Sequence, residues 1–309
     1  MEYAIGIDLG GTSIKYALVS EEGDSFFEGR LPSFASVSSA KVMEQLAKAA
    51  MMVKTMADGK GWSVKGIGVG TPGIVDVTNR IVLGGAENIA GWENVDIASF
   101  LEGQTGLPVV VSNDANLMGL GEAKYGAGHG CTHVVFLTVG TGIGGAVIID
   151  GKLFNGFANR GTELGHVPLI ANGERCACGA VGCLEHYAST AALVRRFTQL
   201  AAAQGMKFGE EINGELIVRL YRDAHPLAVQ CMNEHFFYLG RGIAGFINTF
   251  SPQRVVIGGG VSECGAFYLE EIKKVVKENV IADCAVNTEV VIAGLGNRAG
   301  YVGAASLIL

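Results

Sequence analysis

Short apolar runs alternate with glycine turns and helix-like segments along the whole chain. An apolar strand is predicted at residues 4–8, and a second apolar run at 14–19 follows Gly10-Gly11-Thr12 directly. Because strand resumes after the glycines, this pattern predicts a β-hairpin rather than a strand that leads into a helix. A third strand is predicted at 25–30. Residues 41–56 have helical composition and contain no Gly or Pro, which predicts a helix.

The same alternation continues toward the C-terminus. Strands predicted at 134–138 and 144–149 surround Gly140-Thr141-Gly142, a second glycine-tipped hairpin. Further strands are predicted at residues 66–70, 108–111, 254–257 and 289–293. Further helices are predicted after residues 113–116 and at residues 189–203, 227–250, 266–277 and 300–308. Two similar α/β halves follow from this order, with a boundary after the segment 113–116.

Composition narrows the class of protein. The chain has 309 residues, of which 49% are apolar, and no apolar run is long enough to span a bilayer. The N-terminus carries no basic region or cleavage signal, so a cytoplasmic protein without a membrane partner is expected. A net charge of −7 argues against a nucleic-acid partner. Four scattered cysteines are expected to be buried thiols in a reducing compartment: Cys131, Cys231, Cys264 and Cys284.

One histidine and three cysteines form the most specific cluster in the sequence. His166, Cys176, Cys178 and Cys183 together supply the four ligands of a closed tetrahedral zinc site, which leaves no position for water or substrate. Such a zinc ion is structural and fixes a loop. In the alternative interpretation, the cysteines are small buried apolar residues and the histidine is a cap. The carboxylates Glu163 and Glu185 flank the cluster, so the zinc loop would orient two acceptors for a polar ligand.

Both glycine-tipped hairpins indicate anion binding. Residues 8–12 and 138–142 each offer backbone N–H groups freed by glycine, together with a small hydroxyl. Neither is a P-loop, since no Gly-Lys-Ser/Thr follows, and neither opens a dinucleotide-binding helix. A tight hairpin turn is the alternative for each one alone. With the glycines at 258–260, the pair predicts a nucleotide held across a cleft between the halves.

Asp114 is the candidate catalyst. It follows an apolar strand and begins a helix, where the positive end of the helix dipole favours a carboxylate. The alternative is that Asp114 or Asn113 is only an N-cap. The neighbouring amides of Asn113 and Asn116 suit sugar hydroxyls, which need many hydrogen-bond partners when they are buried.

These motifs resemble those of the ROK family of bacterial sugar kinases, most of all its glucokinase branch. The resemblance rests on residues 8–12, Thr71-Pro72-Gly73, residues 88–92, residues 113–116, residues 138–145, Glu163 to His166, the cysteine cluster and residues 256–262. It implies an α/β, two-domain actin-like (ribonuclease-H-like) ATPase fold, which is usually dimeric, with ATP and sugar in the cleft between the domains. The domains are expected at 1–115 and 116–296, with a last helix at 297–309 that packs back onto the first domain.

The resemblance also implies roles for individual residues. Asp114 matches the general base on the sugar hydroxyl, and Asp8 matches the carboxylate that faces Mg²⁺. The matches to sugar contacts are Gly73, Asn88, Asn113, Asp114, Glu163, His166 and Glu185. The matches to the ATP-binding segments are Asp8, Gly10, Gly11, Thr12, Gly140, Thr141, Gly142, Gly259 and Gly260. His166, Cys176, Cys178 and Cys183 match the structural zinc site.

The sequence departs from the family pattern at two positions. The family commonly has Lys after the first Gly-Gly-Thr, whereas this chain has Ser13 there and Lys15 later. Before Glu163 the family usually has Gly, whereas this chain has Thr162. Because Thr162 is bulkier than glycine, the sequence leaves the identity of the sugar open.

The predicted reaction is phosphoryl transfer from MgATP to a hexose, with glucose as the first candidate. N-acetylmannosamine, N-acetylglucosamine and fructose are the alternatives. A sugar-sensing regulator is a further alternative, since some members of the family are repressors. Such regulators carry a helix-turn-helix domain before the first phosphate loop, which in this chain begins at residue 8.

Overall fold

The computed structural model describes residues 1–76, 78, 80–86 and 88–309, and they form two compact units. Unit 1 contains Met1–Gly130, Ala146–Thr162 and Gly294–Leu309. Unit 2 contains Cys131–Gly145 and Glu163–Ala293. The chain therefore passes between the units after Gly130, Gly145, Thr162 and Ala293.

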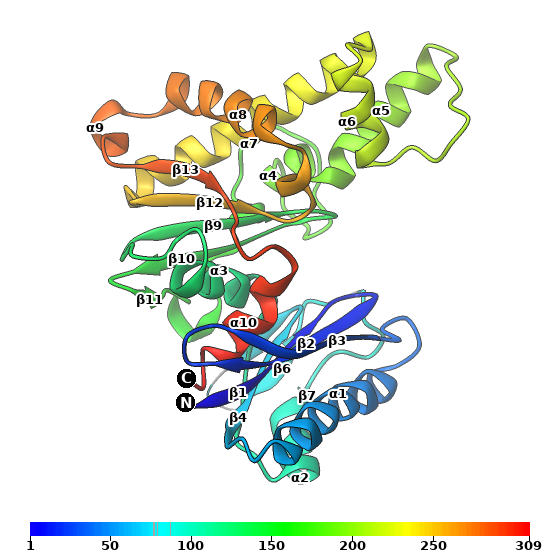
Figure 1. The fold of residues 1–309 in the computed structure, drawn as a ribbon. Helices are drawn as coiled ribbons and strands as arrows, with labels where there is room; N and C mark the ends of the chain where they lie inside the picture. Colours follow the sequence, from blue (N-terminus) through cyan, green and yellow to red (C-terminus); the bar gives the residue numbers. More distant parts are fainter. Residues whose placement is uncertain (77, 79, 87) are drawn as a thin grey trace. The chain divides into compact units, whose positions relative to one another are not determined.

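A five-stranded sheet forms the centre of unit 1, in the order β3-β2-β1-β4-β8 (Figure 1). Its strands are β1 (Tyr3–Leu9), β2 (Ser13–Ser20), β3 (Ser25–Pro32), β4 (Val64–Thr71) and β8 (Val109–Asn113). β1 and β2 pair antiparallel from Tyr3 with Ser20 to Leu9 with Ile14, which confirms the first hairpin. β4 pairs parallel with both β1 and β8, so the ends of β1, β4 and β8 reach the same edge of the sheet.

Helices cover both faces of this sheet because the side chains of β1 alternate between two apolar layers. Ile5 and Ile7 belong to the core that includes the first two helices, whereas Ala4 packs with Tyr301 of the last helix. The helices of unit 1 are α1 (Ser39–Gly59), α2 (Ile97–Thr105), α3 (Asp114–Tyr125) and α10 (Ala299–Ala305), with short 3₁₀ turns at Phe157–Asn159 and Gly296–Arg298. Ser38 caps α1 by accepting a hydrogen bond from the backbone of Lys41 at 3.2 Å.

A small antiparallel sheet also belongs to unit 1 and was not predicted. Its strands are β5 (Ile74–Asp76), β6 (Ile81–Gly84) and β7 (Val95–Asp96), in the order β5-β6-β7. Strands this short carry too little alternation to be recognised from sequence. Residues 88–92, one of the segments that carry the family resemblance, lie beside the main sheet of unit 1, since Trp92 Nε1 donates to Thr71 Oγ1 of β4 at 2.8 Å.

The second five-stranded sheet has the order β11-β10-β9-β12-β13. Its strands are β9 (Val134–Val139), β10 (Ile143–Ile149), β11 (Lys152–Leu153), β12 (Arg254–Gly258) and β13 (Glu289–Ile292). β12 pairs parallel with β9 and with β13. The division between the units falls within β10, since residues from Ala146 onward belong to unit 1.

The longer helices of unit 2 follow the predicted order. They are α4 (Leu184–Ala188), α5 (Thr190–Ala203), α6 (Gly214–Arg222), α7 (Pro226–Phe250), α8 (Ala266–Asn279) and α9 (Ala282–Ala285), with 3₁₀ turns at Leu164–His166 and Gly260–Glu263. α4, α6 and α9 were not predicted. α7 and α8 pack together around His235 and Tyr268, whose ring nitrogen Nε2 and hydroxyl lie 2.6 Å apart in the core.

The observed division of the chain differs from the predicted boundary at 115/116. α3 belongs to unit 1 because it packs along α10, so the first passage between units comes after Gly130 instead. Ala146–Thr162 also belongs to unit 1. The C-terminal segment Gly294–Leu309 lies in unit 1, the unit that contains the N-terminus. A cleft between the units stays a prediction. No helix among the described residues is long and apolar enough to cross a membrane.

Candidate functional site

Asp114 is the first residue of α3, directly after β8. The cap of this helix is Asn113, whose Oδ1 accepts a hydrogen bond from the backbone N–H of Asn116 at 3.1 Å. Asp114 Oδ1 accepts from the N–H of Ala115 at 2.9 Å. The capping role therefore falls to Asn113, and the half-buried carboxylate of Asp114 lies in the first turn, at the positive end of the helix dipole.

The carboxyl of Asp8 lies close to Asp114 at the end of β1. Its side chain is buried, with 5% of the residue exposed. Burial, and next the negative charge of Asp114, raise the pKa of Asp8 to about 7, while the charge of Lys15 lowers it. A cation beside two acidic groups would relieve this repulsion. Asp8 therefore fits the role of the carboxylate facing Mg²⁺, which prefers oxygen ligands.

The first glycine loop is a hydrogen-bonded turn. The N–H of Gly10 donates to the carbonyl of Ser13 at 2.9 Å. Ser33 holds the other side of the turn, because its hydroxyl donates to the Gly11 carbonyl at 3.0 Å and its N–H to the Thr12 carbonyl at 3.1 Å. Ser33 was missed by the sequence analysis, since a lone serine twenty residues from the loop gives no signal. Lys15, the displaced lysine, donates to Asn297 Oδ1 at 2.8 Å.

Two predicted sugar contacts lie next to these elements in unit 1. A Cβ on Gly11 would come within 2.9 Å of Asn88 Nδ2, so the amide of Asn88 faces the first glycine loop. The carbonyl of Gly73 accepts from Asn113 Nδ2 at 3.1 Å. The structure thus brings Asn88 to the first glycine loop and Gly73 to the start of α3.

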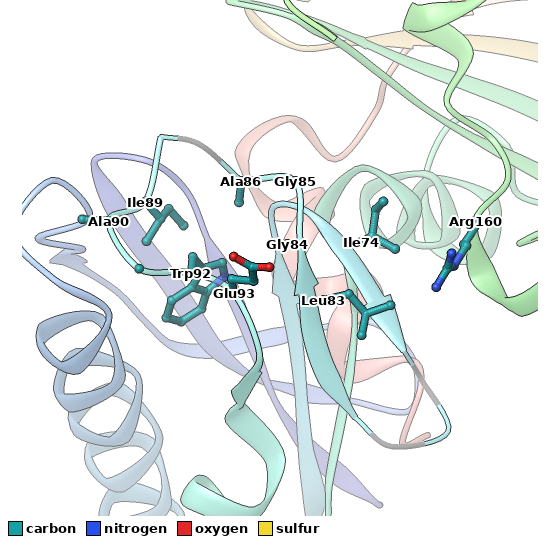
Figure 2. Close-up of a pocket in the computed structure, with 11 residues that line it drawn as sticks. Ile74, Leu83, Gly84, Gly85, Ala86, Ile89, Ala90, Trp92, Glu93 and Arg160 are labelled. Carbon is teal, nitrogen blue, oxygen red and sulfur yellow. The ribbon is translucent and has the colours of Figure 1, made fainter. Parts of the chain in front are cut away.

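An open cavity of about 620 Å³ lies beside this group. Figure 2 shows apolar side chains of the small sheet and of the segment after it, with Glu93 and Arg160 as the charged groups. The lining residues are Ile74, Leu83, Gly84, Gly85, Ala86, Ile89, Ala90, Gly91, Trp92, Glu93 and Arg160. Asn88, Asn113 and Asp114 are not among them, so the cavity is a neighbour of the candidate site and not its centre.

The second glycine loop and the segment with Gly259 and Gly260 meet in unit 2. The N–H of Gly140 donates to the carbonyl of Gly142 at 2.9 Å, and the Gly140 carbonyl accepts from Thr190 at 2.8 Å. Gly259 has φ +86°, and a Cβ there would lie 2.4 Å from the carbonyl oxygen of Val139. Only glycine fits this contact between the ends of β9 and β12. Gly259 and Gly140 are therefore close neighbours in the fold.

Glu163 and His166 lie at a 3₁₀ turn, Leu164–His166, that follows the third passage between units. Glu163 is exposed and His166 is half-buried. Gly165 fits against β10, since a Cβ there would lie 2.0 Å from the Ile143 carbonyl oxygen. This contact places the Glu163 and His166 segment beside the second hairpin within unit 2.

The predicted zinc ligands converge. One ligand atom from each of His166, Cys176, Cys178 and Cys183 lies within 4.8 Å of the other three. His166 Nδ1 is 3.7 Å from Cys176 Sγ, and Cys178 Sγ is 3.6 Å from Cys183 Sγ. Two sulfurs each ~2.3 Å from a tetrahedral zinc ion lie ~3.8 Å apart, so this spacing fits zinc.

The thiols of the cluster differ in their environment. A hydrogen bond from the backbone of Ala180 lowers the pKa of Cys178. Burial, together with the neighbouring sulfurs, raises the pKa of Cys183 to about 12. A buried thiol surrounded by other sulfurs gains most from a dication, because metal ligation favours the thiolate. The donor set, its spacing and this crowding of sulfurs all fit a structural zinc ion.

Comparison with known proteins gives a consistent result across the chain. A family model described as "ROK family" matches residues 4–309. A glucokinase from Thermotoga maritima is 35% identical over 98% of this chain and 96% of its own length. A crystal structure of a ROK family glucokinase from Streptomyces griseus, in complex with glucose and AMPPNP, superposes with a TM-score of 0.84. It is 34% identical over 99% of this chain and 98% of its own.

Similarity also extends to regulators. A xylose repressor from Caldicellulosiruptor bescii is 30% identical over 99% of this chain, which spans 77% of the repressor. The fold is therefore shared by kinases and regulators, so the fold alone does not distinguish these two functions. The structural likeness confirms the predicted class, an α/β two-domain actin-like (ribonuclease-H-like) ATPase fold.

Proposed function

Because this chain belongs to the ROK family, we propose that it is an ATP-dependent hexose kinase that converts glucose to glucose 6-phosphate. The glucokinases are similar to this chain over nearly its full length. The observation within the chain that supports catalysis most directly is the position of Asp114. It starts α3 without serving as its cap and lies close enough to Asp8 to raise the pKa of that group.

Asp114 is proposed as the general base. As the γ-phosphoryl group moves, the bond from the bridging oxygen of ADP to the γ-phosphorus breaks and a bond from the sugar hydroxyl oxygen to phosphorus forms. The hydroxyl proton passes to the Asp114 carboxylate. Since phosphoryl transfer has a loose transition state, most of the acceleration comes from positioning and charge neutralisation, and the base adds ~10²–10⁴-fold.

Backbone groups are proposed to hold the nucleotide. Gly11 and Thr12 in unit 1 and Thr141 and Gly142 in unit 2 offer backbone N–H groups in tight turns, a geometry that suits phosphate oxygens. The N–H groups of Gly10 and Gly140 close these turns by donating to carbonyls within them. Gly259 and Gly260 would approach the adenosine, since neither carries a side chain. Mg²⁺ would be held through Asp8 and the ATP oxygens, where it neutralises phosphate charge.

The sugar is proposed to bind through groups of both units. Asn88 and Asn113 supply amides, and Glu163 and Glu185 supply acceptors for hydroxyl groups. A zinc ion on His166 and the three cysteines would fix the segment from Glu163 to Glu185. Zinc acts here through loop geometry, because four protein ligands leave it no open position.

Two alternatives to a glucose kinase can be tested: a kinase for another sugar, and a regulator. Thr162 stands where the resemblance leads one to expect glycine, so an N-acylhexosamine or fructose is the alternative substrate. A sugar-responsive regulator is supported by the match to the xylose repressor. It is disfavoured by Asp114 and by the net charge of −7.

Assembly and location are also proposed. We expect a homodimer, as the resemblance to the family implies. We expect a cytoplasmic enzyme, because the reaction consumes ATP and because zinc ligation needs reduced thiols in the cysteine cluster.

A coupled ADP-release assay tests the proposal. Purified protein with MgATP is given glucose, mannose, fructose, N-acetylglucosamine and N-acetylmannosamine separately, with Asp114→Asn as the matched inactive control. Glucose-dependent ADP release that the Asp114→Asn protein lacks is the expected result. Tight sugar binding without turnover by the wild-type protein would contradict the kinase and favour the regulator.

A further inference from the structure

Glu122 is a carboxylate with no exposed surface in the interior of unit 1. It lies on α3, two turns after Asp114, and has no salt bridge within the part of the chain that the structure describes. Its two oxygens accept three backbone hydrogen bonds. Oε2 accepts from Ala127 at 2.8 Å and from Gly294 at 2.9 Å, and Oε1 accepts from Leu295 at 2.7 Å.

The three donors lie where the chain leaves and re-enters unit 1. Ala127 comes just before the passage after Gly130, and Gly294 and Leu295 come directly after the return from Ala293. The packing is close, since a Cβ on Gly126 would lie 2.2 Å from Glu122 Oε2. A Cβ on Gly294 would lie 3.3 Å from the Ala127 nitrogen. One buried carboxylate thus ties the outgoing and the returning segments together.

A third passage lies beside α3. The hydroxyl of Thr162, the last residue before unit 2, lies 3.1 Å from Oδ1 of Asn116. Thr162 has φ +66°, a conformation unusual for a β-branched residue, so the surrounding contacts hold this passage in place. Two of the four passages are therefore anchored to the helix that begins with Asp114. A third lies beside this helix through the Thr162 hydroxyl, which is also 2.7 Å from the Gly161 carbonyl oxygen.

Hinges are a few residues at the ends of elements that absorb a change in backbone angles when domains move. We infer that Glu122 is a positioning residue that sets the hinge between the two units and so aligns Asp114 for phosphoryl transfer. The inference rests on the proposed kinase function, because ATP and sugar are bound by groups from both units in that proposal. Binding of ATP can then favour binding of the sugar, and the reverse, only if the segments of the hinge move together.

Glu122→Gln is the test, because the amide keeps the size of the side chain but presents an NH₂ group to backbone N–H donors. At least one of the three hydrogen bonds is lost. We expect kcat for glucose to fall about tenfold or more, since small misplacement at a reaction centre is costly. Calorimetry should show glucose affinity without nucleotide within about twofold of wild type, and loss of the gain in glucose affinity that AMPPNP gives the wild-type protein.

The matched control is Glu102→Gln. Glu102 also accepts a backbone hydrogen bond in unit 1, from Val109 at 3.1 Å, and pairs with Arg80, but it is not part of any of the four passages. Its variant should keep kcat and the nucleotide effect. Small-angle scattering of the unliganded proteins should show a broader distribution of distances for Glu122→Gln than for Glu102→Gln. If Glu122→Gln does not fold, Gly294→Ala is measured in the same way, because its methyl group presses on Ala127 without removing the carboxylate.

The outcomes separate this inference from the proposed function. A wild-type protein without sugar phosphorylation overturns the function, and the scattering comparison still decides whether Glu122 sets the hinge. An active wild type, with a Glu122→Gln variant that is less stable but keeps kcat, the nucleotide effect and the scattering profile, shows a merely structural carboxylate and overturns the inference.

Discussion

The carboxylate of Glu185 accepts a hydrogen bond from the backbone N–H of Ile143 at 2.7 Å. A Cβ on Gly142 would lie 2.4 Å from the same oxygen, so the carboxylate lies directly against the turn of the second hairpin. Glu185 comes two residues after Cys183, a member of the predicted zinc cluster. The cluster, the candidate sugar acceptor and the candidate phosphate turn are therefore connected within unit 2, and disturbing one is expected to disturb the others.

The four residues of the cluster are expected to hold zinc in the purified protein. We expect one zinc ion per chain in protein purified without added metal, measured by elemental analysis. Cys178→Ser should lose the ion, lower the melting temperature and weaken glucose binding together, because the loop orients Glu163 and Glu185. Cys131→Ser, outside the cluster, is the control. Fully active protein without metal would show that the four residues do not need zinc.

Asp114→Asn is expected to lower kcat by ~10²–10⁴-fold while glucose binding stays measurable by calorimetry. The amide keeps the shape of the side chain but accepts no proton. Asp96→Asn is the control, since Asp96 is the N-cap of α2 in the same unit and Asn caps a helix equally well. If the Asp114→Asn enzyme kept more than about a tenth of wild-type turnover, well above that range, Asp114 would not be the base.

The raised pKa of Asp8 predicts that the free energy of unfolding depends on pH when Mg²⁺ and nucleotide are absent. Its pKa is raised from 3.8 to about 7, so between these values the folded protein binds more protons than the unfolded chain. Stability should therefore fall as pH rises from about 4 to about 7, by roughly 4 kcal/mol at 1.36 kcal/mol per unit. Chemical unfolding at several pH values measures it. Asp8→Asn should remove most of this slope, and an unchanged slope would refute the assignment.

Thr162 provides a test of substrate choice. We expect glucose to exceed N-acetylglucosamine and N-acetylmannosamine by about tenfold or more in kcat/KM, because a bulkier residue beside Glu163 crowds an N-acetyl group. Thr162→Gly should narrow the gap, and glycine also suits the φ of +66° at this position. Steady-state kinetics on the three sugars decides. Equal activity on either N-acetyl sugar would make an N-acylhexosamine kinase the better assignment.

No specific DNA binding is expected, because a net charge of −7 repels a polyanion. Fluorescence anisotropy at low salt, with and without glucose, is the measurement. Saturable binding below micromolar protein that depends on the DNA sequence would contradict the prediction and favour a regulator.

Local patterns of the sequence were sufficient for much of the fold. Both glycine-tipped hairpins, the start of the helix at Asp114 and the convergence of His166 with the three cysteines depend on neighbours within about twenty residues. Periodicity and ligand spacing report such short-range relationships directly. The small sheet β5–β7 and the helices α2, α4, α6 and α9 were missed, because short elements carry little periodic signal.

Only the tertiary structure decided which distant groups share an environment. Glu122 meets Gly294 and Leu295 across 172 and 173 residues, and no pattern along the chain indicates that pairing. The nearness of Asp114 to Asp8 likewise follows from three strands ending at one edge of a sheet. The sequence determined which residue types are present and how each segment folds locally. Packing determined which carboxylates are buried, which are paired, and which are available for catalysis.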